Sequence, residues 1–152
     1  MTMPIGVEPK MNLAGYSGTP LGKKLGLRDG QVALLLGVPA HLQEIAAFPG
    51  FAHTATAIEG TSSRRFDYIH GFNTERVRLE AQAAALVDRL KPDGILWISW
   101  PKRASGVATT LTEDALREIF LPLGLVDVKV CAVDAVWSGL KFMFRKEIRA
   151  SL

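Results

Sequence analysis

The chain has 152 residues, of which 48% are hydrophobic and 22% charged, a balance that excludes a disordered chain and suits a single domain. The net charge of +3 permits an anionic ligand but is too mild to indicate nucleic-acid binding. The single cysteine, Cys131, excludes an internal disulfide and a cysteine-based metal cage. No apolar run reaches the roughly 18 residues of a membrane span, and no signal-peptide pattern opens the chain. We therefore expect a cytoplasmic protein that does not bind a membrane.

Residues 1–18 are rich in Gly, Pro and Met and show no periodicity, which predicts an extended or flexible arm. A single α/β domain is predicted to follow over residues 19–148. Its first element is a short helix, because Thr19 can cap the start, Pro20 suits the first helical position and Gly26 can end it in a left-handed conformation.

The next segments alternate between strand and helix patterns. The unbroken apolar run QVALLLG, residues 31–37, is typical of a strand buried on both faces of a parallel sheet. A helix is predicted over residues 39–48, with Pro39 at its start. Two further strands are predicted, a weak one over residues 52–60 and a short one over residues 66–72.

The second half continues the alternation and ends in two strands. The clearest helix is predicted to start at Asn73 or Thr74 and to end at Pro92–Gly94. An apolar strand follows over residues 95–100, and then a charged loop and a helix that Thr112 can cap. The last two strands are separated only by residues 134–138, which forces antiparallel pairing. This order predicts a three-layer α/β sandwich with a Rossmann-like, mostly parallel sheet.

Residues 86–102, LVDRLKPDGILWISWPK, resemble the later half of class I methyltransferases that use S-adenosylmethionine. The resemblance extends over Phe66 to Lys146 and includes the terminal reversed hairpin. A closer similarity, at residues 14–27, 96–107 and 123–142, is to a small bacterial family known only as a domain of unknown function. These resemblances imply a truncated, degenerate methyltransferase fold, and the second brings no activity or catalytic residue.

The chain departs from the methyltransferase pattern at the cofactor loop. Those enzymes usually carry several glycines after the first strand, so that the backbone can approach the cofactor without a Cβ clash. Here the segment LLLGVPAHL offers only Gly37, and Pro39 lacks a backbone donor. Glu59 is the one candidate to bind the ribose hydroxyls. The segment from Gly37 to Phe66 is also short, which predicts that a strand–helix unit of the cofactor-binding half is missing. S-adenosylmethionine is therefore predicted to be an unlikely cofactor, and the true cofactor stays unknown.

Ligands of open α/β sheets bind beyond the carboxyl ends of the strands. His70 could act there as acid or base, or it could be a core histidine that is bonded to the backbone. Trp100 could stack on a ligand or simply pack, and the cationic side chains after it could neutralise a phosphate or stay solvated. No pair of histidines has metal-ligand spacing, so no metal site is predicted. The predicted ligand-binding residues are Gly37, Glu59, His70, Trp100, Lys102 and Arg103.

These features favour a non-catalytic binding module that holds a small anionic or nucleotide-like ligand, or a protein partner, at the strand ends. The alternative is an active S-adenosylmethionine-dependent methyltransferase with an unusual cofactor pocket. Nucleic acid is an unlikely partner, because the basic residues are scattered and no basic-aromatic stripe is present. The sequence leaves catalytic residues and oligomeric state open.

Overall fold

The computed structural model describes residues 20–152, so the predicted arm over residues 1–18 and the predicted cap Thr19 lie outside the described residues. Six strands form one sheet in the order β3–β2–β4–β5–β7–β6. The strands are β2 (Val32–Leu36), β3 (His53–Ala55), β4 (Phe66–Phe72), β5 (Leu90–Pro101), β6 (Leu125–Ala132) and β7 (Trp137–Phe144).

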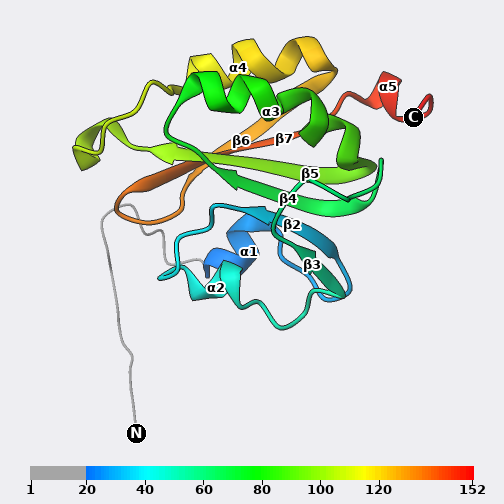
Figure 1. Cartoon of the computed structure of the whole chain (residues 1–152), viewed down its shortest axis with the longest axis horizontal. Helices are drawn as coiled ribbons and strands as arrows, with labels where there is room; N and C mark the ends of the chain where they lie inside the picture. The colour runs from blue at the N-terminus through cyan, green and yellow to red at the C-terminus, as the bar shows by residue number, and fades with distance from the viewer. Residues whose placement is uncertain (1–19) are drawn as a thin grey trace, which may run out of the picture.

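The sheet is parallel from β3 to β5, and the terminal hairpin β6–β7 joins it antiparallel to β5. Figure 1 shows α3 and α4 on one side of the sheet and α1 and α2 on the other, which confirms the predicted three-layer α/β architecture. The helices are α1 (Leu21–Leu25), α2 (Gln43–Ala46), α3 (Arg76–Arg89), α4 (Glu113–Phe120) and α5 (Lys146–Arg149), with single 3-10 turns η2 (Arg103–Ser105) and η3 (Leu121–Leu123).

The sheet carries a separate apolar core on each side. On the α3/α4 side, Leu116 and Phe120 of α4 pack with strand residues such as Phe142. On the α1/α2 side, Trp97 is fully buried, and its indole N–H donates to the carbonyl oxygen of Leu25 at 2.8 Å. Trp97 is therefore part of the core on this side. Each side chain on the central strands therefore belongs to a defined side of the sheet, because successive residues point to opposite faces.

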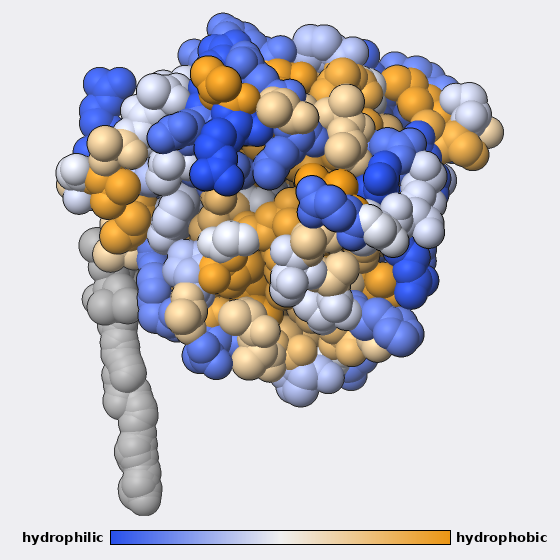
Figure 2. Space-filling model, viewed as in Figure 1, coloured by the Kyte–Doolittle hydropathy of each residue, from blue (hydrophilic) through white to orange (hydrophobic). Residues whose placement is uncertain are grey.

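The first half departs most from the predicted elements. α2 begins only at Gln43, because Pro39 to Leu42 form a turn in which the N–H of Leu42 donates to the carbonyl oxygen of Pro39. β3 has three residues, and residues 56–65 then pass to β4 without forming a helix or strand. This agrees with the prediction that a strand–helix unit is lacking before Phe66. Ile58 of this segment packs on the core, and Figure 2 shows apolar surface across the middle of the face.

The second half follows the predicted elements closely, with two corrections at helix ends. Thr112 caps α4 as predicted, because its Oγ1 accepts the N–H of Ala115 at 3.0 Å. α3 begins at Arg76 rather than near Asn73, and it ends at Arg89. The strand β5 follows at once, so Pro92–Gly94 lie within it. Within residues 20–152, no helix combines the length and apolar character needed to cross a membrane.

Arg64 holds the end of α3 at the amino edge of the sheet. Its guanidinium donates to the carbonyl oxygens of Val87 at 2.8 Å and Asp88 at 2.6 Å, and lies 5.3 Å from the ring centre of Phe144. The N–H of Leu90 also donates to the Val87 carbonyl and the N–H of Arg64 to that of Asp88, so the Arg64 side chain adds to the hydrogen bonds of the last helical carbonyls. We expect Arg64→Ala to lower the free energy of unfolding by about 1–3 kcal/mol, measured by urea denaturation. Arg65→Ala, at the exposed neighbour, should change it by less than about 0.5 kcal/mol, and equal losses would contradict this role.

Candidate functional site

The carboxyl ends of β2, β4 and β5 meet at one edge of the sheet, because these strands are parallel neighbours. At this edge Gly37 ends β2 with a φ of +69°, a left-handed conformation that favours glycine. A Cβ at Gly37 would lie 3.1 Å from the backbone oxygen of Phe72 at the end of β4. The turn after β2 is thus closely packed against β4, and the exposed backbone of Gly37 is open to a ligand.

Asn73 lies beside this turn. Leu36 of β2 pairs with Gly71 of β4, and the Asn73 amide nitrogen, Nδ2, lies 3.4 Å from where a Cβ of Gly71 would be. The backbone N–H of Asn73 donates to the carbonyl oxygen of Ser99, which holds the residue at the strand end. Within residues 20–152 its side-chain amide makes no hydrogen bond with another residue, so this half-buried group can serve a ligand.

A cavity of about 470 Å³ opens at the carboxyl end of β5, on the α3/α4 side of the sheet where Trp100 packs. Trp100 and the loop that leads to α4 both line it. The loop is held because Thr109 Oγ1 and the N–H of Thr110 both donate to the carbonyl oxygen of Thr74. The lining residues are Trp100, Pro101, Arg103, Gly106–Thr109 and Leu111–Glu113.

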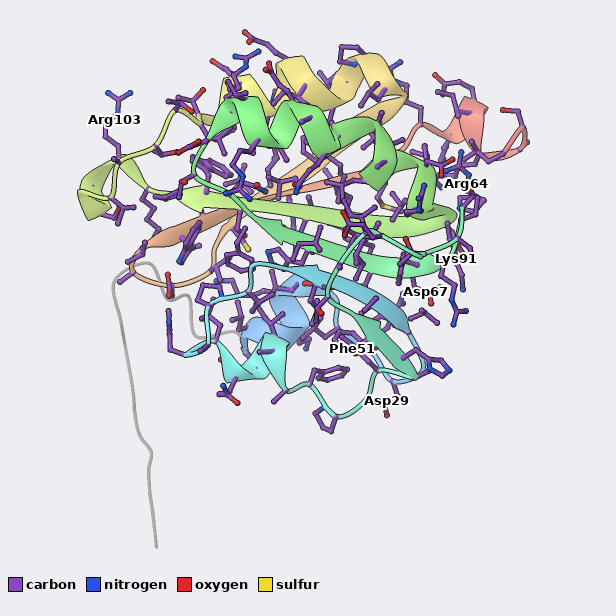
Figure 3. All side chains as sticks on the ribbon, viewed as in Figure 1. Asp29, Phe51, Arg64, Asp67, Lys91 and Arg103 are labelled. Carbon is purple, nitrogen blue, oxygen red and sulfur yellow. The ribbon has the colours of Figure 1, made fainter. Side chains whose placement is uncertain are left out.

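Trp100 and Arg103 are therefore brought together in one cavity. Trp100 is 7% exposed and packs within the α3/α4-side core, so only a small part of the indole is available to a ligand. Arg103 is exposed, and in Figure 3 its side chain points outward from the sheet, at the opposite end from Arg64. Lys102 is half-buried beside the cavity, and its backbone N–H donates to Val136 at 2.7 Å.

His70 lies inside the α1/α2-side core rather than at the edge. Its side chain is fully buried, with Nδ1 2.9 Å from the hydroxyl of Tyr68 and Nε2 2.7 Å from the hydroxyl of Ser99. Burial lowers the pKa of His70 to about 3, so the imidazole is neutral at physiological pH. A neutral ring accepts one hydrogen bond and donates the other, which satisfies both hydroxyls. His70 therefore does not reach a ligand at the strand ends. Its hydrogen-bond partners are side chains rather than the backbone group that the core alternative expected.

Glu59 does not join the other predicted residues. It is exposed in a turn after β3, and its neighbour Gly60 lines a separate cavity of about 180 Å³. That cavity is also lined by Val32 and Phe66, the first residues of β2 and β4, and so lies toward the amino ends of these strands. The side chain of Glu59 makes no polar contact with the described part of the chain.

A contact between distant segments fixes the turn after Gly37. His41 Nε2 lies 2.8 Å from Asp134 Oδ2, which joins this turn to the β6–β7 hairpin. Burial raises the pKa of Asp134, but hydrogen bonds from His41 and from the N–H groups of Trp137 and Val136 outweigh burial and hold it below its usual value. The sequence indicated neither this contact nor the free amide of Asn73, because both depend on residues brought together by strand pairing.

No protein-family model matches this chain, and no curated protein matches it. Solved structures do. A SAM-dependent methyltransferase from Aquifex aeolicus is similar, with a TM-score of 0.59 and 15% sequence identity. The match covers 81% of this chain and 87% of that chain. Magnesium protoporphyrin IX methyltransferase from Synechocystis PCC 6803 with bound SAM has a TM-score of 0.55 and 12% sequence identity, and the match covers 82% of this chain and 74% of that chain. 1,6-didemethyltoxoflavin-N1-methyltransferase from Burkholderia thailandensis, with bound S-adenosylhomocysteine, is also similar, with a TM-score of 0.54 and 16% sequence identity. That match covers 83% of this chain and 75% of that chain.

The chain has a methyltransferase-like Rossmann fold, as predicted. The prediction that S-adenosylmethionine is an unlikely ligand is contradicted, because these neighbours include enzymes with bound S-adenosylmethionine or its demethylated product. The error has a physical reason. The prediction depends on the number of glycines in one loop, whereas in the folded chain the exposed Gly37 turn lies against β4, beside the amide of Asn73.

Proposed function

We propose that this protein is an S-adenosylmethionine-dependent methyltransferase that holds its cofactor at the carboxyl ends of β2 and β4. The observation that carries the proposal is the exposed, left-handed Gly37 turn packed against the end of β4. A large planar ligand can approach the main chain there because no Cβ intervenes. The fold of the similar methyltransferases supports the same reading.

The residues at this edge fit such a cofactor. The Gly37 backbone and the half-buried side chain of Val38 would contact the adenosyl group, and the Asn73 amide would donate to or accept from its polar atoms. Once bound, the cofactor supplies an electrophilic methyl group. The His41–Asp134 contact keeps the turn in place before the ligand arrives, which reduces the ordering cost of binding.

The cavity beside Trp100 would hold the methyl acceptor. Its volume of about 470 Å³ lies within the range of small-molecule sites, roughly 300–1,000 Å³. Arg103 and Lys102 would attract an acidic group on the acceptor. Since His70 is buried away from the edge, the chain's contribution is positioning, and the acceptor must arrive already nucleophilic.

Calorimetric titration with S-adenosylhomocysteine tests the proposal. Wild-type protein is expected to bind with a micromolar dissociation constant, and Asn73→Ala about tenfold more weakly, because one hydrogen bond in a partly buried site is lost. Ser62→Ala, an exposed polar position on the segment between β3 and β4, should bind like wild type. Absence of binding by the wild-type protein at about 1 mM ligand would refute the proposed function.

A further inference from the structure

Two lysines face each other across the terminal hairpin. Lys129 of β6 pairs with Lys141 of β7, and Lys141 pairs on its other side with Trp97 of β5. Directly paired residues point to the same face of a sheet, so both lysines lie on the α1/α2 side, where Trp97 is buried. This is the opposite face from the Trp100 cavity.

Helix α1 borders this pair. It lies over β5, where the Trp97 indole bonds to Leu25, and its Lys24 reaches across to donate to the carbonyl oxygen of Ala132 in β6 at 2.9 Å. Arg28 follows α1 and is exposed, and Lys129 and Lys141 lie on the neighbouring hairpin. We call this cluster of three cations the basic step.

The basic step has no compensating charge in the described part of the chain. No carboxylate within residues 20–152 lies within 4.0 Å of Lys24 or of the three members of the basic step. By contrast, Arg76 and Arg89 of α3 and Arg117 of α4 each contact a carboxylate. Like charges directly opposite each other on a sheet are destabilising. Burial lowers the pKa of Lys141, and the charges of Lys129 and Arg28 lower it further. A bound anion would remove this repulsion.

We propose that the basic step is a binding site for the diphosphate group of a small molecule. Lys129 and Lys141 lie opposite each other on adjacent strands, and Arg28, which follows α1, is close enough for its charge to act on Lys141, so the cluster matches the charge of two adjacent phosphates. A nucleic-acid backbone is less suitable, because tight binding there uses a longer track of roughly 6–10 phosphate contacts. The inference does not rest on the proposed methyltransferase function, since it involves the other face of the sheet.

Titration with inorganic diphosphate at low salt tests this site. We expect wild type to bind, and Lys129→Ala/Lys141→Met to bind at least about tenfold more weakly. Methionine retains the apolar stem of Lys141, so the fold is preserved. The matched control Arg78→Ala/Lys146→Met removes two exposed cations elsewhere and should bind within about twofold of wild type. Equal weakening in both double variants would indicate general charge attraction and overturn the proposal.

Thermal unfolding gives an independent readout. Diphosphate should raise the melting temperature of wild type by mass action and leave that of Lys141→Met nearly unchanged. Without ligand, Lys141→Met should melt at or above the wild-type temperature, because the repulsion is relieved. An unligated variant that melts lower would overturn the proposal, as would a wild type that binds a single-stranded oligonucleotide more tightly than diphosphate.

Discussion

Replacing Gly37 with alanine is expected to weaken binding of S-adenosylhomocysteine by at least about tenfold and to lower the free energy of unfolding by about 1–2 kcal/mol. The loss of stability follows from the left-handed backbone at φ +69°, which an L side chain rarely adopts. The loss of affinity follows from the added Cβ, which would lie 3.1 Å from the backbone oxygen of Phe72 and force the turn away from β4. Calorimetry and urea denaturation on the same preparation measure both effects.

Gly30 provides the matched control. It also has a left-handed backbone, with φ +89°, but an added Cβ would meet nothing within 4 Å. Gly30→Ala should therefore show the same loss of stability with wild-type affinity for the ligand. If the two variants bound equally well, the Gly37 turn would not be part of the cofactor site.

The second large effect concerns His70 and acid. Because its folded pKa is about 3 and an unfolded histidine titrates near 6.5, the unfolded chain takes up a proton on acidification while the folded protein does not. The stability from neutral His70 is thus complete above pH 6.5 and is lost as the pH falls toward 3. The loss is about 1.4 kcal/mol per pH unit, or about 2 kcal/mol between pH 6.5 and 5.

Comparison with His70→Gln isolates this contribution. The variant is less stable at neutral pH, since it disturbs the contacts with Tyr68 and Ser99, but its stability should fall less steeply between pH 6.5 and 5. His53→Gln, at an exposed position, should retain the wild-type pH dependence. Parallel curves for wild type and His70→Gln would show that His70 is not held neutral by burial.

The sequence predicts the parts of the fold that local signals specify. The Thr112 cap depends on a hydrogen bond three residues away, and the antiparallel hairpin follows from the short join after β6. The apolar run before Gly37 identifies a central strand whether or not its neighbours are known. Such features lie within a few residues of their cause, so a single chain is enough to find them.

The candidate site depends on contacts between distant segments and was therefore predicted only in part. His70 is buried because Ser99, 29 positions away, completes its hydrogen bonds across two strands. The Asn73 amide lies free because α3 starts later, at Arg76, whose N–H is accepted by Thr110. α2 is short because Pro39 to Leu42 form a turn before it, which the apolar pattern of the sequence did not indicate.

The most direct test of the cofactor site is chemical-shift mapping of the backbone amides during titration with S-adenosylhomocysteine. We predict that the signals of Gly37, Val38 and Asn73 move together and saturate with the calorimetric dissociation constant. No movement at saturating ligand, or movement confined to residues away from the ends of β2 and β4, would contradict the account.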